Sequence, residues 1–247
     1  MIEVQNKLIW KILAILILLV MIVSCATLSI AVDNNLTNTI YVPDDYAKIQ
    51  WAVDNATAGD TITVRDGTHI ENIKVKRRLT IRSENGPDTT IVRAAKNDDH
   101  IFEVTANYVN LSGFTVEGAT SGSAGISLHD TDYCNISDNN CSNNDEDGIY
   151  LEDSYNNVIY PNNFINKNDN VDSYNSHNTW NSTSKITYIY DGSTYTNYLG
   201  NYWDDYTGTD SDGDGIGDTP YSVNSDKDNY PLIEPQEIYV FNLTYPS

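Results

Sequence analysis

The sequence predicts an all-β chain folded as a single-stranded parallel β-helix, or solenoid, of about six coils with a short N-terminal capping helix. Two observations predict this fold. From Thr61 onward, apolar residues alternate with a period of two in short runs that Gly, Asp and Asn residues separate. Related strands then return at intervals of 22 to 25 residues, which is the length of one coil of such a helix.

The first 31 residues predict a targeting segment. Two lysines precede an apolar run over 12–23, and Ser29-Ile30-Ala31 resembles a signal-peptide cleavage site. Three outcomes remain open: a cleaved signal peptide over 1–31, an uncleaved membrane anchor within 8–31, or lipidation of Cys25. Each of them predicts export to the cell surface or beyond it, with membrane contact through this segment alone.

Residues 32–60 are expected to form an N-terminal cap. A short strand is predicted at 40–43, and Asp44 and Asp45 stand where a helix N-cap belongs. Apolar residues then recur at helical spacing from Tyr46 to Val53. A helix with one such apolar face would cover the hydrophobic end of a β-solenoid.

The β-helix itself is expected over residues 61–206. Residues 125–130 recur as residues 148–153, and Asn139-Asn140-Cys141 recurs as Asn162-Asn163-Phe164, both at a shift of 23. Equivalent residues of neighbouring coils should therefore stack about 4.8 Å apart.

Asparagine is expected at the tight corners between strands. Asn110, Asn135 and Asn157 each precede an apolar residue that is expected to face inward, the last of which is Val158. Asn tolerates the left-handed αL conformation better than other residues except Gly, and its amide can bond to an Asn one coil away. We therefore expect these three residues to form an αL ladder.

Three further features are interpreted as parts of the fold. The aromatic residues that crowd 188–206 predict a cap on the last coil, with a sugar-stacking platform as the alternative. The basic run over 74–78 is expected on an edge strand, where charge blocks pairing with another chain. Cys134 and Cys141 are expected in or near the core, and a disulfide between them remains open.

Several segments resemble NosD-type and pectin-esterase-like β-helix proteins. Residues 40–46 (IYVPDDY) and 60–64 (DTITV) resemble their first coils. The runs NTWN at 178–181, NYLGNYWDDY at 197–206 and DNYPL at 228–232 resemble the closing segment of NosD-type proteins. The resemblance spans nearly all of the chain after the targeting segment. It implies a right-handed β-helix of a type common on archaeal cell surfaces.

The family name also implies periplasmic copper binding or a role in maturation of nitrous-oxide reductase. Soft copper sites need clustered Cys, Met and His side chains. Both Met residues lie in the targeting segment, and the four His residues are dispersed at His69, His100, His129 and His177. Copper binding is therefore not expected, although the fold is.

An acidic Gly/Asp segment within 207–235 is expected to join the last coil to a C-terminal cap, and residues 236–247 to form a tail. The segment matches most of an EF-hand-type calcium loop, with carboxylates at positions 1, 3, 5 and 9, Gly215 at position 6 and a backbone carbonyl at position 7. The predicted Ca²⁺ ligands are the side chains of Asp210, Asp212, Asp214 and Asp218 and the carbonyl of Ile216.

This loop lacks one ligand of the motif. Position 12 holds Tyr221 in place of a bidentate Glu, and Asp226 or Asp228 is expected to compensate. A structural Ca²⁺ is predicted, and a solvated linker is the alternative.

A second candidate site is an acidic column on one face of the β-helix. Stacking should place Asp130 beside Asp153 and His129 beside Glu152, about 5 Å apart. Carboxylates at that distance suit a retaining glycosidase. However, no catalytic pattern of pectin-degrading enzymes is found and no Arg follows Arg93, so solvated corner residues are an equal explanation.

The formal net charge of −21 disfavours nucleic acid as a partner and suits cation binding or an acidic cell coat. Sequons for N-glycosylation fit a surface glycoprotein; they lie at Asn35, Asn55, Asn110, Asn135, Asn140, Asn181 and Asn242. The sequence therefore predicts a non-catalytic, exported surface module with a structural, adhesive or glycan-contacting role, whose partners would be surface polysaccharide or other envelope components. The alternatives are a lyase or hydrolase of acidic glycans and a NosD-like maturation factor.

Overall fold

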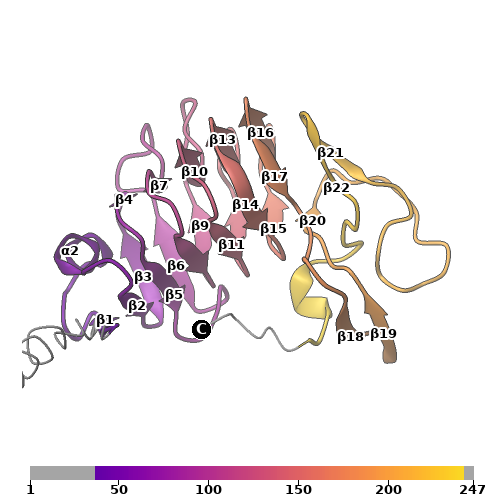
Figure 1. Cartoon of the computed structure of the whole chain (residues 1–247), viewed down its shortest axis with the longest axis horizontal. Helices are drawn as coiled ribbons and strands as arrows, with labels where there is room; N and C mark the ends of the chain where they lie inside the picture. The colour runs from indigo at the N-terminus through magenta and orange to yellow at the C-terminus, as the bar shows by residue number, and fades with distance from the viewer. Residues whose placement is uncertain (1–36, 242–247) are drawn as a thin grey trace, which may run out of the picture. The chain divides into compact units, whose positions relative to one another are not determined.

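The computed structural model describes residues 37–241, which form a parallel β-helix with three sheets (Figure 1). Sheet A contains β1 (Thr39–Val42), β2 (Thr61–Val64), β5 (Thr80–Ser83), β8 (Asn110–Ser112), β11 (Asn135–Ser137), β14 (Tyr155–Ile159) and β17 (His177–Thr179). Sheet B contains β3 (Gly67–Ile70), β6 (Thr90–Arg93), β9 (Thr115–Glu117), β12 (Asn140–Ser142), β15 (Asn163–Ile165) and β20 (Tyr202–Trp203). Sheet C contains β4 (Ile73–Val75), β7 (Phe102–Val104), β10 (Ile126–His129), β13 (Ile149–Glu152) and β16 (Val171–Tyr174).

Inward-facing side chains of successive coils stack in the register that the repeat predicts. Leu128 pairs with Leu151 in sheet C, and Cys141 pairs with Phe164 in sheet B. All four side chains are fully buried. The parallel β-helix of about six coils is therefore confirmed. Cys134 and Cys141 are buried free thiols, and burial raises the pKa of Cys134 to about 11.

A short helix, α2 (Ile49–Asn55), covers the N-terminal end of the core, as predicted. It buries Ile49, Ala52 and Val53 in the same hydrophobic cluster as the coil interior. The strand before it, β1, pairs in parallel with β2 and so forms the first rung of sheet A. The β-helix therefore begins at Thr39, inside the segment that was expected to be a cap.

The expected N-cap at Asp44 or Asp45 is wrong. The helix begins at Ile49, and the carboxylate of Glu71 from the next coil accepts the N–H groups of Ile49 at 2.9 Å and of Gln50 at 3.0 Å. Asp45 instead accepts the N–H of Tyr41 at 2.7 Å. A carboxylate that is distant in sequence satisfies the first turn, because the stacking of coils brings it there.

The same helix closes an exposed sheet edge. Strand β4 is the edge of sheet C, and the Gln50 amide takes the place of a further strand. Its Oε1 accepts the N–H of Lys74 at 2.7 Å, and its Nε2 donates to the Lys74 carbonyl at 3.4 Å. The basic run therefore begins on an edge strand, as predicted.

The tight corners pair an αL residue with a buried polar residue that follows it. Asp138 has a φ of 56° before Asn139, and Asn156 has a φ of 59° before Asn157. Asn110 and Asn135 do not adopt αL and lie on the outer face of sheet A. Asparagines do lie at the corners, as predicted, but Asn110 and Asn135 are not the residues that form them.

One asparagine ladder runs through Asn139, Asn162 and Asn201, which are all fully buried. The side-chain oxygens of Asn162 and Asn201 each accept the backbone N–H of the Asn one coil before, at 3.0 Å, and the oxygen of Asn139 accepts the N–H of Phe114 at 3.1 Å. Each Nδ2 donates to a backbone carbonyl of the preceding coil. The ladder thus satisfies donors and acceptors that a sharp corner would otherwise leave unpaired.

The register of β14 differs from the prediction by one residue. Asn135 pairs with Val158 and Ile136 with Ile159, so Ile159 faces inward and Val158 does not. The shift allows the buried side chain of Asn157 to accept the N–H of Cys134 at 2.7 Å. Hydrogen bonding at the corner therefore decides the register that the apolar pattern left open.

A hairpin of β21 (Tyr221–Val223) and β22 (Asp226–Asp228) closes the C-terminal end. Asp226 accepts the N–H of Asn178 at 2.6 Å, and Asp228 accepts the N–H of Asn201 at 2.7 Å. The two carboxylates thus accept the N–H groups that asparagines of a further coil would accept. Burial raises the pKa of Asp228 to about 6.

Aromatic stacking accompanies this closure, as the capping interpretation predicts. Trp203 is buried between Phe164, at a centroid distance of 4.6 Å, and Tyr221, at 4.2 Å. Its Nε1 donates to Asp228 at 3.0 Å. These rings fill the end of the bore, so Trp203 is unavailable as part of a surface platform for sugars.

A second small core lies beyond the last coil, where a hairpin of β18 (Ile186–Tyr190) and β19 (Ser193–Asn197) packs with the C-terminal segment. Its buried residues are Tyr188, Leu199, Ile216, Leu232 and Tyr239. The 3₁₀ helix η1 (Gln236–Ile238) leads into Tyr239, which is 4% exposed. Residues 236–241 are therefore part of the cap, and the expected tail is wrong for them.

Within residues 37–241, none of the helices is long and apolar enough to span a bilayer. The predictions for 1–31, including lipidation of Cys25, lie outside the described residues.

Candidate functional site

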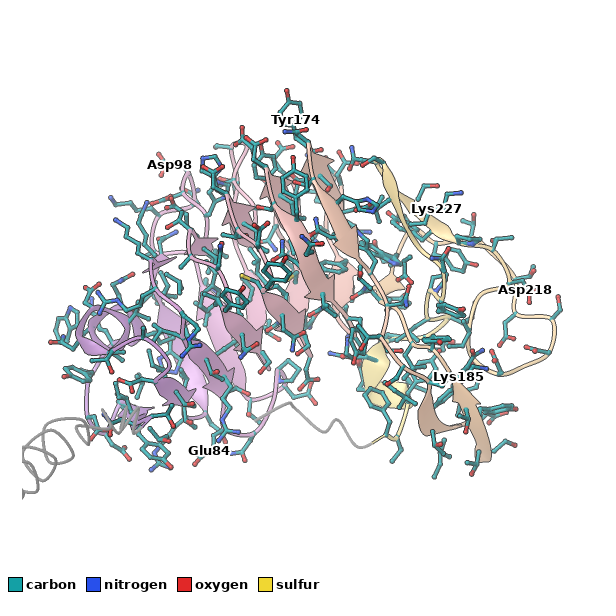
Figure 2. All side chains as sticks on the ribbon, in the orientation of Figure 1. Glu84, Asp98, Tyr174, Lys185, Asp218 and Lys227 are labelled. Atoms are coloured by element: carbon teal, nitrogen blue, oxygen red, sulfur yellow. The ribbon has the colours of Figure 1, made fainter. Side chains whose placement is uncertain are left out.

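The predicted calcium loop lies on the long connection between β20 and β21, where Figure 2 labels Asp218. Asp210, Asp212 and Asp214 each place one carboxylate oxygen within 4.8 Å of the other two. Among the described residues this is the one such group of three or more Asp, Glu, His or Cys side chains. The structure therefore brings together three of the five predicted ligands.

The backbone shapes this cluster in the manner of a calcium loop. The carboxylate of Asp210 accepts the N–H groups of Gly213, Asp214 and Gly215 at 2.8 to 3.2 Å. Gly215 has a φ of +88°, a conformation that strains any residue with a side chain. The chain can therefore fold back and aim alternate carboxylates at one point.

Electrostatic repulsion acts within the cluster, and no basic side chain of residues 37–241 forms an ion pair with its three carboxylates. The neighbouring Asp214 raises the pKa of Asp212 above its usual value. Asp212 is the exposed member of the three, whereas Asp210 and Asp214 are partly buried. A bound cation would relieve this repulsion, and carboxylate oxygens are the ligands that Ca²⁺ prefers.

The other predicted ligands lie differently. Asp218 turns away from the cluster, because its carboxylate accepts bonds from Thr209 and Ser211 at 2.6 to 3.0 Å. Asp226 and Asp228 cannot supply the missing ligand at position 12, since both are buried at the end of the asparagine ladders. The expectation that they compensate is wrong. The structure thus offers a site with fewer carboxylates than an EF-hand.

The loop is attached to the small C-terminal core through its own backbone. The hydroxyl of Tyr188 donates to the carbonyl of Asp214 at 2.8 Å, and that of Tyr239 donates to the carbonyl of Gly215 at 2.5 Å. Asn197 donates to the Asp214 carboxylate at 3.1 Å. Burial raises the pKa of both tyrosines, so they remain neutral donors. Order in the loop is therefore linked to order in the cap.

The predicted acidic column is also assembled, at the edge where sheet C turns into sheet A. His129 pairs with Glu152 in register, with Nδ1 and Oε2 3.5 Å apart. Asp130 and Asp153 occupy equivalent αL corners of successive coils, with φ values of 52° and 49°. The Asp130 side chain is 74% exposed. These groups stand on a solvated ridge, and none of them lines the cavities described for residues 37–241.

The described residues gather no soft-metal site. Cys134 lies buried just before β11 of sheet A, and Cys141 lies buried in β12 of sheet B. His177 approaches Asp226, with Nδ1 and Oδ1 2.5 Å apart, and His100 stacks on Tyr150. Neither arrangement joins a thiol or thioether, so the residues do not fit the copper site that the family name implies.

Comparison with known proteins supports the resemblance. Residues 92–208 match the family described as periplasmic copper-binding protein (NosD). This NosD-type region covers somewhat less than half of the chain and holds the central coils. The resemblance seen in the sequence is therefore confirmed for the repeats.

A curated relative extends the comparison. A protein named cell surface glycoprotein, from Methanothermus fervidus, is 31% identical over 131 residues. The match covers 52% of this chain and 21% of the relative, so the chain spans about a fifth of that protein's length.

Two solved structures resemble this chain more distantly. An alginate lyase from Paenibacillus sp. FPU-7 has a TM-score of 0.45 at 21% identity, covering 51% of this chain and 44% of the lyase. A pectin methylesterase in complex with a hexasaccharide has a TM-score of 0.38 at 11% identity, covering 67% and 59%.

Proposed function

We propose that this chain is a non-catalytic, exported cell-surface β-helix module that contacts glycans and is stabilised by calcium. The observation that carries the proposal is the convergence of Asp210, Asp212 and Asp214 on a loop that is bonded to the C-terminal cap. A cation held there would fix the end of the β-helix and not take part in a reaction.

Export and surface location are supported by the comparisons and by the chemistry of the chain. The curated relative is a cell surface glycoprotein and the matched family is periplasmic. The strong negative charge suits an environment rich in divalent cations or salt. The targeting segment predicted for 1–31 also supports export.

The donor set fits a hard cation. Three carboxylates and the carbonyl of Ile216 would hold it, and water would complete the usual six to eight oxygen ligands of Ca²⁺. Because the loop lacks a bidentate carboxylate at position 12, we expect an affinity in the range of extracellular modules, with Kd about 10⁻⁴ to 10⁻³ M.

The test is calorimetric Ca²⁺ titration of the full chain, together with thermal melting with and without chelator. The variant is Asp212→Asn, because the exposed Asp212 can lose its charge while the hydrogen bonds of Asp210 and Asp214 remain. The control is Asp98→Asn, an equal change of charge on another exposed loop (Figure 2).

At a free Ca²⁺ concentration of about 100 times Kd, the stabilisation should be about 2.7 kcal/mol, or roughly 5–10 °C in Tm. Asp212→Asn should abolish most of this shift, and Asp98→Asn should keep it. If the wild type neither binds Ca²⁺ nor changes its Tm, the Gly/Asp segment is a linker and the calcium part of the proposal is wrong.

A further inference from the structure

A polar groove lies on the outer face of sheet A, on the coils of the N-terminal half. Its volume is about 420 Å³. One wall is a column of Thr61, Thr80, Asn110 and Asn135, which stack in register on β2, β5, β8 and β11. Hydroxyl and amide groups are thus repeated about every 4.8 Å along a rigid surface.

A second column runs beside the first, two residues further along each strand. It contains Arg82, Ser112 and Ser137, which also stack in register. None of the described residues that line the groove is acidic, although the chain has 35 Asp and Glu residues. The described lining therefore carries no negative charge.

Ser137 provides a buried group without a partner at this groove. Because Ile136 faces inward, the alternation of the strand directs Ser137 to the outer face. The residue is only 4% exposed, and within residues 37–241 its Oγ has no hydrogen-bond partner. A buried hydroxyl without a partner is unusual, and it indicates a ligand that supplies the missing bond.

Arg82 provides an unpaired charge. Its guanidinium has one contact among the described residues, from Nε to the hydroxyl of Thr63 at 3.5 Å, and no carboxylate within ion-pair distance. By contrast, Arg65 pairs with Asp44 and Glu84, and Arg93 pairs with Glu117. A planar guanidinium held in a carboxylate-free groove is suited to bind a carboxylate of another molecule in bidentate fashion.

We propose that this groove binds a strand of an acidic polysaccharide, with a uronate carboxylate at Arg82 and sugar hydroxyls along the Thr/Asn and Ser columns. The inference rests on the proposed glycan contact and assigns it a surface and a ligand class. A peptide is a poorer fit, because the lining offers no apolar pocket for side chains.

The experiment measures binding of the full chain to immobilised polygalacturonate and to the same polymer after complete methyl esterification, at fixed calcium and ionic strength. Two variants test the groove. Arg82→Gln removes the charge, and Ser112→Asp places a carboxylate in register with Arg82 on the neighbouring strand. Arg93→Gln, on the outer face of sheet B, is the control with an equal change of charge.

We expect the wild type to prefer the uronate polymer. Arg82→Gln and Ser112→Asp should each weaken that binding about tenfold or more, as for a lost charged hydrogen bond, and Arg93→Gln should change it less than about twofold. Uronate binding that is unchanged in both groove variants would overturn the groove and leave glycan contact elsewhere on the chain. Failure of the wild type to bind either polymer would overturn both the groove and the proposed glycan contact.

Discussion

Removing one rung of the asparagine ladder is the most direct test of how this β-helix is held together. Asn162 is fully buried at the centre of the ladder. Its Oδ1 accepts from the backbone N–H of Asn139 at 3.0 Å and from the Asn139 amide at 3.1 Å. Its Nδ2 donates to Ile136 at 2.9 Å and to Asn201 at 3.1 Å. Asn162→Ala deletes all four bonds.

The free-energy cost depends on which hydrogen bonds each former partner of Asn162 retains. The Asn139 amide keeps two carbonyl acceptors, the Ile136 carbonyl keeps the N–H of Tyr160, and the Asn201 oxygen keeps the N–H of residue 162. The backbone N–H of Asn139 alone loses its acceptor. One orphaned buried donor costs about 1–3 kcal/mol, and the other lost bonds about 0.5–1.5 kcal/mol each. We expect Asn162→Ala to lower the free energy of unfolding by roughly 2.5–7.5 kcal/mol.

Urea unfolding followed by circular dichroism would measure this loss, with an unchanged slope m as the check that unfolding stays cooperative. Asn135→Ala is the matched control, because Asn135 lies on the outer face and its side chain has no hydrogen bond among the described residues. The control should cost less than about 0.5 kcal/mol. A decrease in the free energy of unfolding below about 1 kcal/mol for Asn162→Ala would refute the view that hydrogen bonds of the ladder stabilise the corners.

Three further predictions concern pH, modification and catalysis. Burial raises the pKa of Asp228 to about 6, so the folded state binds this proton more tightly than the unfolded state. The free energy of unfolding should therefore increase by about 2–3 kcal/mol as pH falls from 7 to 4. Urea unfolding at a series of pH values would measure this increase, and Asp228→Asn should remove it. Peptide mapping by mass spectrometry of the natively exported protein should find a glycan at Asn55, which is exposed, and none at Asn140, whose Oδ1 is buried. The wild type should release no reducing ends or unsaturated products from alginate or polygalacturonate, and activity abolished by Asp130→Asn and Asp153→Asn would show that the acidic column is catalytic.

Two hairpins of the cap had a local signal in the sequence. Asp191-Gly192 joins β18 and β19 with both residues at positive φ, 44° and 74°, and such a pair between strands is a strong hairpin signal. Asn224 plays the same part between β21 and β22, with a φ of 44°. The aromatic residues around them were recognised as a cap, but the turn residues that shape it were not.

The sequence by itself determined the coil period, the inward columns outside β14 and the capping role of the terminal segments. A strand alternates its faces with a period of two, so the repeat of residues 125–130 at 148–153 is sufficient to set the register of β10 on β13. The clustering of the Asp210, Asp212 and Asp214 carboxylates could also be predicted from the sequence. Their spacing is local, and the turn at Gly215 depends on the chain's own φ.

The tertiary structure alone decided which residues satisfy the backbone at the corners and ends. Glu71 caps α2, and Asp226 and Asp228 end the asparagine ladders, from positions 21 to 48 residues away. It also decided that these two aspartates are unavailable to a cation, and that no carboxylate of the described residues pairs with Arg82. A buried polar group takes its partner from whatever the stacking of coils places within hydrogen-bond distance. That distance in space is set by the whole fold, and no local pattern in the sequence records it.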